Sequence, residues 1–343
     1  MFKPFLAGLL LSGAVNLAPA QSVWNYPDSP TTNILTGVAW SNNQFVVVGR
    51  SASEGNLPAT ILTSPDGNTW TSRTPGTNAG LNAVIWAGTQ WVAVGFTGTI
   101  LTSPDGITWT TRTSGTTNHL TAVVWTGTQL MAVGYSGTIL ISPDGITWTS
   151  RASMTSTLRL VGVAWTGSVF VVVSNEGGFV QTANASALEW TTRNVGTAAV
   201  FRSVVWTGTQ VVITGESQLV GTAPTPVRTS PDGITWTSQT GAGTASYYAT
   251  TWTGSRLVSV GTGVTQSSPD AVTWTTGGTT SLNMLGVAAS ANLLVAVGHA
   301  GIIQTSSTST TGIRNPASRA RVPNMAKPIP GTIQGYRANG RLP

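Results

Sequence analysis

Few residues of this chain could perform acid–base or nucleophilic chemistry. Its 343 residues include ten Asp and Glu, two His and no Cys. Five aspartates recur in one repeated turn phrase, so the free carboxylates are chiefly Glu54, Glu176 and Glu216. Hydrolysis of a glycosidic bond requires two carboxyl groups about 5 to 10 Å apart. Glu176 and Glu216, which fall in successive repeats, are the one pair that could serve this chemistry.

Ligand binding is the alternative use of the same loops. Arginine, tyrosine and histidine offer directional hydrogen bonds together with apolar contact area, which suits a glycan or a protein ligand. Loops at equivalent positions are also polar simply because water covers them, and that explanation stays open. Two histidines in separate repeats and no cysteine provide few ligands, so we expect no metal and no cofactor. The candidate binding residues are Arg50, Glu54, Tyr135, His119, Arg159, Arg202, Tyr248 and His299.

The tryptophans indicate which elements position these residues. One series comprises Trp40, Trp86, Trp125, Trp165, Trp206 and Trp252, and the other Trp24, Trp70, Trp109, Trp148, Trp190, Trp236 and Trp274. A period of about 40 residues with several short strands is typical of a β-propeller or another closed repeat. In the third repeat, residues 120–125, 130–133, 138–141 and 146–151 are β-rich and joined by tight turns. Each repeat is therefore predicted to form one four-stranded antiparallel blade.

The two series also predict how the ring closes. Six full repeats are followed by a seventh, from Met284 to Thr305, that lacks a fourth strand. Residues 22–33 align with residues 108–118, which contain a fourth strand. The N-terminal segment can thus complete the last blade and cover an exposed sheet edge. We predict an all-β, seven-bladed β-propeller over residues 21–308, closed by the N-terminal strand.

A turn phrase, Ser-Pro-Asp-Gly-x-Thr-Trp, connects the third and fourth predicted strands. Asp accepts backbone hydrogen bonds in such a turn, Gly takes a positive φ and Pro fixes the approach. The phrase resembles the Asp-box, or BNR-like, repeat of sialidase-like β-propellers and of the photosystem II assembly factor group. The family pattern has one residue between Asp and Gly, whereas this chain has none. The resemblance implies a structural role for Asp66, Asp105, Asp144, Asp232 and Asp270.

The topology assigns the loops to two faces. If the Asp-box turns join strands three and four, the Thr-Gly-Thr-Gln turns between strands one and two share their face. Loops between strands two and three, and between blades, then lie on the opposite face, which the resemblance implies is the binding face. A sialidase-like site there would use Arg50, Arg159 and Arg202 for a carboxylate and Tyr247 with Glu216 as nucleophile. Arg73, Arg112, Arg151 and Arg193 recur on outer strands and are expected to cover the ring surface.

The two ends differ from the repeats. Lys3, an apolar run from Phe5 to Val15 and Ala18-Pro19-Ala20 predict a signal peptide over residues 1–20, and hence a secreted or cell-surface protein of bacterial-type export. No later run is long and apolar enough to cross a membrane. Residues 309–343 form a basic tail with six Lys and Arg. Parts of it are similar to the C-terminal sorting domain of type IX secretion cargo.

Charge and composition narrow the function further. Without Lys3 and the tail, nine Lys and Arg stand against ten Asp and Glu, so the repeats lack the clustered positive charge of a nucleic-acid-binding face. We predict a monomeric, secreted, non-catalytic binding or scaffold propeller. It would contact glycans or proteins through the face opposite the Asp-box turns. The alternative is a glycoside hydrolase of sialidase-like type that uses the same face.

Overall fold

The computed structural model describes residues 23–52, 58–152, 157–195, 199–216, 225–240 and 243–308, which belong to one compact unit. The predicted signal peptide, the basic tail and Glu54 lie outside the described residues. None of the helical segments in the described ranges has the length and apolar character needed to cross a membrane.

Sheets of antiparallel strands account for nearly all regular structure in the described residues. The first two sheets are β1 (Ile34–Ser41), β2 (Gln44–Arg50), β3 (Ala59–Ser64) and β4 (Thr71–Arg73), then β5 (Leu81–Trp86), β6 (Trp91–Gly95), β7 (Ile100–Ser103) and β8 (Thr110–Arg112). The next two are β9 (Leu120–Trp125), β10 (Leu130–Gly134), β11 (Ile139–Ser142) and β12 (Thr149–Arg151), then β13 (Leu160–Trp165), β14 (Val169–Ser174), β15 (Val180–Asn184) and β16 (Trp190–Arg193). The fifth is β17 (Val200–Trp206), β18 (Val211–Glu216), β19 (Val227–Ser230) and β20 (Thr237–Gln239).

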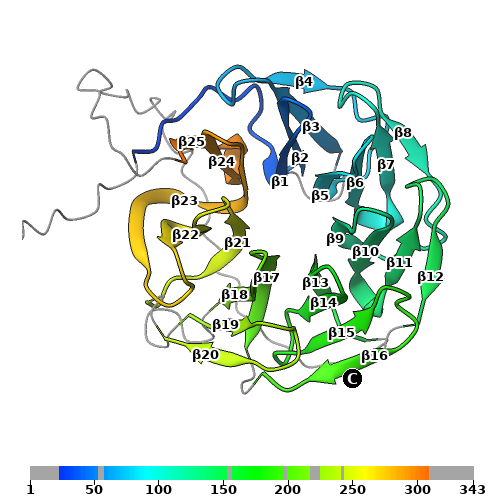
Figure 1. Ribbon diagram of the computed structural model, residues 1–343. Coiled ribbons are helices and arrows are strands. Elements are labelled where there is room, and N and C mark those ends of the chain that lie inside the picture. The colour runs from blue at the N-terminus through cyan, green and yellow to red at the C-terminus, as the bar shows by residue number, and fades with distance from the viewer. Residues whose placement is uncertain are drawn as a thin grey trace, which may run out of the picture. The chain divides into compact units, whose positions relative to one another are not determined.

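The sixth sheet has five strands, β21 (Tyr247–Trp252), β22 (Leu257–Ser268), β23 (Thr275–Ala289), β24 (Leu293–Gly298) and β25 (Ile303–Ser307). Single 3-10 turns η1 (Phe96–Gly98), η2 (Tyr135–Gly137) and η3 (His299–Gly301) follow β6, β10 and β24. The sheets stand around a ring, with the first strand of each four-stranded sheet innermost and the fourth at the periphery (Figure 1). The prediction of an all-β propeller with four-stranded antiparallel blades is confirmed at this level.

The five-stranded sheet consists of two parts that share strand β23. The long strand β23 pairs with β22 through residues 275–283 and with β24 through residues 284–289. Apolar side chains of β22 and β24, including Val258, Val260 and Leu294, pack together in one core cluster. Near the N-terminus, Asn25 exchanges two backbone hydrogen bonds with Thr305 of β25, of 2.8 and 2.9 Å. The N-terminal segment therefore pairs with the last strand.

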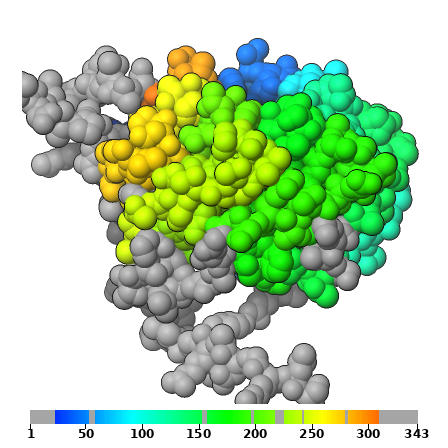
Figure 2. Space-filling model, turned by 60° about the horizontal axis from the view of Figure 1, so that its bottom comes forward, coloured from blue at the N-terminus to red at the C-terminus, as the bar shows by residue number. Residues whose placement is uncertain are grey.

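Apolar layers between neighbouring sheets hold the ring together. The second strands of the blades are almost completely buried, and a core cluster lies between each pair of neighbouring sheets; one of them joins Val47 of β2 to Val295 of β24. Along the green to yellow part of the ring, neighbouring sheets form a continuous surface (Figure 2). Burial of this kind is worth about 25 cal/mol per Å² of apolar surface. Since the sequence has no cysteine, these layers take the place of disulfides.

The Ser-Pro-Asp-Gly turns, called Asp-box turns below after the motif that they resemble, are held together by their own hydrogen bonds. Asp144 accepts the N–H groups of Ile146 and Thr147 on Oδ1 at 2.8 and 2.9 Å, and Ser142 Oγ accepts Gly145 N–H at 2.8 Å. Gly145 has a φ of 73°, and its carbonyl accepts the indole N–H of Trp148 at 3.0 Å. Because the carboxylate binds these two N–H groups, β12 begins only at Thr149, later than the predicted Ile146.

Glutamines at the end of the turns between first and second strands connect successive blades. The amide of Gln44 donates to the Asp105 carbonyl at 2.7 Å, and that of Gln90 donates to the Asp144 carbonyl at 2.6 Å. Val169 occupies the equivalent position in the fourth blade and cannot form this bond. These contacts place both kinds of turn on one face, hereafter the Asp-box face, as the sequence predicted. The loops after each second strand and between blades lie on the other, hereafter the rim face.

Candidate binding face

One residue of each repeat lies at the rim face, at or directly after the last residue of the second strand that pairs with the first. A glycine precedes it in six of the seven repeats, the fourth having Ser174, and allows close approach, because a Cβ on Gly134 would lie 2.1 Å from the carbonyl oxygen of His119. The following residue is then tied to that carbonyl, since Tyr135 N–H donates to it at 2.9 Å. The equivalent residues are Arg50, Phe96, Tyr135, Asn175, Glu216, Thr262 and His299. The repeat thus places seven different side chains at one level of the ring.

A second set comes from a β-bulge near the start of each first strand. The register between first and second strands skips one residue in every repeat, as at Thr121 between Leu120 and Ala122. The hydroxyl of Thr121 donates to the Leu160 carbonyl of the next blade at 2.6 Å. In two later repeats the bulge residue is Arg202 or Tyr248, in place of the threonine that makes this bond between blades.

Cationic and aromatic residues from successive repeats contact one another along the rim face. The ring centroids of Phe96 and His119 are 4.6 Å apart, and those of His119 and Tyr135 are 5.1 Å apart. The guanidinium of Arg50 lies 5.6 Å from the Phe96 centroid. That of Arg159 lies 4.2 Å from the Tyr135 centroid and donates to the Tyr135 hydroxyl. We call His299, Arg50, Phe96, His119, Tyr135 and Arg159 the rim belt.

Both histidines of the rim belt are held neutral near pH 7. The Thr97 backbone N–H donates to His119 Nδ1 at 2.9 Å, which leaves the ring proton on Nε2. Burial lowers the pKa of His119, and the charge of Arg159 lowers it further. Burial and the charge of Arg50 act in the same way on the pKa of His299. The rim belt can therefore offer arginine charge, aromatic faces and imidazole N–H groups to a ligand.

Arg202, Glu216 and Tyr248 form a separate group farther around the ring. Arg202 Nε donates to Glu216 Oε1 at 2.9 Å, with side-chain exposures of 31% and 22%. The Arg202 guanidinium also lies 5.9 Å from the Tyr248 ring, whose hydroxyl accepts a hydrogen bond from Thr262. Glu216 is thus neutralised by an arginine. Among the described residues, no hydrogen bond or ion pair joins it to Glu176.

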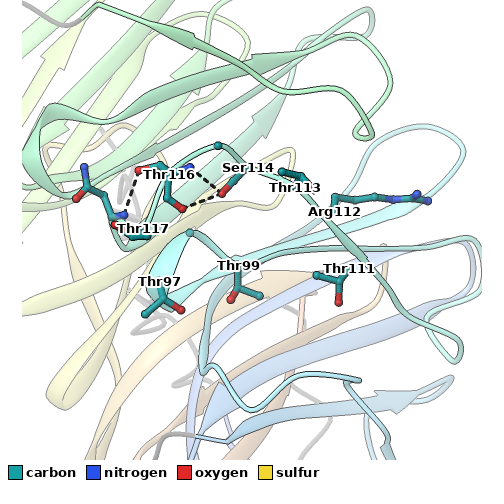
Figure 3. A pocket seen from close by; sticks show the side chains of 11 residues that line it. Thr97, Thr99, Thr111, Arg112, Thr113, Ser114, Thr116 and Thr117 are labelled. Atoms are coloured by element: carbon teal, nitrogen blue, oxygen red, sulfur yellow. Dashed lines mark hydrogen bonds between the residues drawn. The ribbon is translucent and has the colours of Figure 1, made fainter.

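A hydroxyl-rich hollow of about 680 Å³ adjoins the rim belt. Its walls are residues 97–99 and 111–118, so that several threonine side chains line it, whereas the Arg112 side chain points away from them and donates to Thr102 Oγ1 at 2.8 Å (Figure 3). Within its wall, Thr116 N–H donates to Ser114 Oγ at 3.3 Å. Thr97 lines this hollow, and its backbone N–H also donates to His119 Nδ1. No sequence signal marks this hollow, because threonines are abundant in every repeat.

The structure separates the predicted site residues into groups. Arg50, His119, Tyr135, Arg159 and His299 come together in the rim belt, whereas Arg202 and Tyr248 meet Glu216. Glu176 contributes its backbone to a turn with Ser174. Glu54 lies outside the described residues.

Tyr247 is a core residue rather than a rim residue. Its side chain is fully buried, it stacks on Trp274 with centroids 5.8 Å apart, and its hydroxyl donates to Gln266. Burial raises its pKa well above the usual value. A phenol in this environment cannot reach a ligand on the rim face, so the predicted nucleophile is not placed for catalysis.

A ring of antiparallel blades with side chains presented at one rim defines the class: the protein is a β-propeller. No protein-family model and no curated protein matches the sequence. Among solved structures, it is similar to YCF48 from Cyanidioschyzon merolae, at 17% identity and a TM-score of 0.63, over 82% of this chain and 98% of that chain. It is also similar to YCF48 bound to D1 peptide, at 18% identity and a TM-score of 0.67, over 86% and 97%.

A chain of a mitotic checkpoint complex is similar as well, at 16% identity and a TM-score of 0.65, over 89% of this chain and all of that chain. These similarities show a shared fold, and at identities this low they show nothing beyond the fold.

Proposed function

We propose that this protein is a non-catalytic binding propeller that holds a segment of another protein on its rim face. The rim belt is the observation that carries the proposal. Five of its residues, from Arg50 through Phe96, His119 and Tyr135 to Arg159, form a continuous row of guanidinium groups and aromatic rings, and Arg and aromatic side chains are enriched in protein-binding hot spots. The similar YCF48 structure with a D1 peptide supports a protein ligand over a glycan.

The contacts weigh against the sialidase-like alternative. Acid–base hydrolysis needs a free carboxylate and a second group within reach. Glu216 is ion-paired with Arg202, and Tyr247 is buried in the core. A hydrolase would have to recruit a different nucleophile from the rim.

Two further proposals concern the whole chain. We interpret the five-stranded sheet as two blades that share β23, with the segment around Asn25 as the last strand, which makes the ring seven-bladed. The core cluster between β22 and β24 supports this interpretation, because residues of one flat sheet do not pack face to face. We also propose that residues 1–20 direct export, so that the ring acts in the periplasm or outside the cell.

A peptide display screen tests the function. The probe is a library of random 12-residue peptides, selected on the mature full chain. A glycan array is run in parallel and checked for released sugar. Affinities of the enriched peptides are then compared between the wild type and Arg159→Gln, with Arg73→Gln as control. Like Arg159, Arg73 donates to a side-chain hydroxyl, that of Thr63 at 2.9 Å, but it lies on the outer strand β4.

We expect at least a tenfold loss of peptide affinity in Arg159→Gln and none in Arg73→Gln. Equal affinities in both variants, or sugar release without peptide binding, would refute the proposal.

A further inference from the structure

The Asp-box face carries a row of exposed aliphatic side chains. The position after the turn residue of positive φ, which is glycine in three of these blades and alanine in two, is 46 to 66% exposed in five consecutive blades, although a turn in water is usually polar there. These residues are Ile107, Ile146, Leu188, Ile234 and Val272, with exposures of 48%, 50%, 66%, 49% and 46%. We call them the aliphatic arc. The first blade instead has Asn68 at this position, which shows that the turn does not itself need an aliphatic residue.

The turn aspartate accepts the backbone N–H of four members of the arc. In the second blade, Ile107 N–H donates to Asp105 Oδ1 at 2.8 Å, and in the fifth Ile234 N–H donates to Asp232 Oδ1 at 2.7 Å. Val272 is held by Asp270 in the same way at 2.8 Å. An apolar side chain and a carboxylate therefore sit next to each other in most turns. In the fourth blade, Glu189 supplies the acid beside Leu188.

The carboxylates beside the arc have no cationic partner among the described residues. The ion pair described there is Arg202 with Glu216, on the rim face. Arg256, which follows the Thr-Gly-Ser turn of the sixth blade, is buried and donates to the Ser307 carbonyl. Nine arginines and nine carboxylates occur in the described residues, yet the arginines gather toward the rim and the outer strands. The Asp-box face is therefore anionic while the ring is close to neutral.

The combination defines the kind of partner. One exposed aliphatic side chain in each of five successive turns provides repeated apolar contact area on this face, and the carboxylates beside them favour a positively charged partner and repel anionic lipid or nucleic acid. We propose that the aliphatic arc and its neighbouring aspartates bind a cationic amphipathic segment of another protein, with Lys or Arg on the carboxylates and apolar side chains on the isoleucines. This surface is separate from the rim belt, so the inference does not depend on the function proposed for that belt.

A pair of model peptides tests the inference on the mature full chain. The first is a labelled 14-residue peptide of Lys and Leu in an amphipathic pattern, and the second has Glu in place of each Lys. Binding is measured by fluorescence anisotropy at 50 and 300 mM NaCl. We expect the Lys peptide to bind, to weaken at least tenfold at the higher salt concentration, and the Glu peptide not to bind.

Two triple variants separate the apolar and the ionic contributions. In the first, Ile107, Ile146 and Ile234 are each replaced by Asn, which the first blade already carries at this position. In the second, Asp105, Asp144 and Asp232 are each replaced by Asn, which keeps an Oδ1 acceptor for the turn but removes the charge. Each triple variant should weaken the Lys peptide at least tenfold, and the Asp series should also reduce the salt dependence. Arg73→Gln on the outer strand β4 is the control and should change nothing.

Thermal unfolding of each variant, followed by circular dichroism, shows that the ring is folded. If the Asp series proves unfolded, the isoleucine series and the salt dependence still decide the question. Equal binding of the Lys and Glu peptides would overturn the inference. So would undiminished binding in folded variants, or binding to phosphatidylcholine vesicles in place of the peptide.

Discussion

Replacing Gly134 by alanine should be unusually costly, although its backbone is extended and alanine is an ordinary residue in a strand. The new Cβ would lie 2.1 Å from the His119 carbonyl oxygen and 3.0 Å from the Leu120 Cα, both of them backbone atoms. To relieve this contact, the starts of β9 and η2 must move apart by about 1 Å. That movement strains the packing, at about 1 to 3 kcal/mol, and weakens the 2.9 Å bond from Tyr135 N–H, at about 1 kcal/mol. We expect a loss of about 3 kcal/mol in unfolding free energy.

Urea unfolding followed by tryptophan fluorescence measures this loss, with Gly115→Ala as the comparison. Gly115 has a φ of 74° and would place its Cβ with nothing within 4 Å. That variant should cost only about 1 to 2 kcal/mol, the conformational penalty of a left-handed residue. Gly134→Ala should also weaken rim-face ligands, because Tyr135 shifts with its backbone. If the two variants were equally stable, or Gly134→Ala the more stable, close approach would not be the reason for this glycine.

Three other predictions use the same unfolding assay. Gln90→Val should cost about 1 kcal/mol through loss of the 2.6 Å bond to the Asp144 carbonyl; an unchanged stability would show that the glutamines do not fasten the blades. Arg202→Gln and Glu216→Gln should each destabilise the ring by about 1 kcal/mol, since each leaves the other, half-buried charge unpaired; an unchanged stability in both variants would contradict the ion pair. Unfolding free energy should also fall as pH drops below about 4, because turn N–H groups hold the pKa of the five Asp-box carboxyls below the ordinary 3.8. Their contribution is present above that unfolded value and is lost as pH falls through the folded one; a variant with all five replaced by Asn should show a flatter profile, and an identical profile would refute the assignment.

Most features of the fold that the sequence predicts correctly depend on local sequence patterns. The two tryptophan series and the turn phrase carry the period, the order of strands and the division into two faces, because each depends on residues close together in the sequence. The turn role of Asp144 follows from its own neighbours, whose N–H groups it accepts. The alignment of residues 22–33 with a fourth strand agrees with the pairing of Asn25 and Thr305.

Contacts between blades required the tertiary structure. Whether Arg159 meets Tyr135, or Arg202 meets Glu216, depends on how far neighbouring sheets rotate around the ring, and no local pattern encodes that rotation. The aliphatic arc likewise becomes a surface only when five similar turns are brought to one face.

Tyr247 and Tyr248 show the physical limit most clearly. Side chains of a strand alternate between two sides, but a bulge adds one residue and reverses that alternation. The bulge at Tyr248 sends Tyr247 into the core against Trp274 and leaves Tyr248 beside Arg202. The sequence by itself determined that two tyrosines stand where a blade begins. The pairing of that strand with its neighbour decided which of them faces a ligand, because a bulge is a property of the pair and not of either strand.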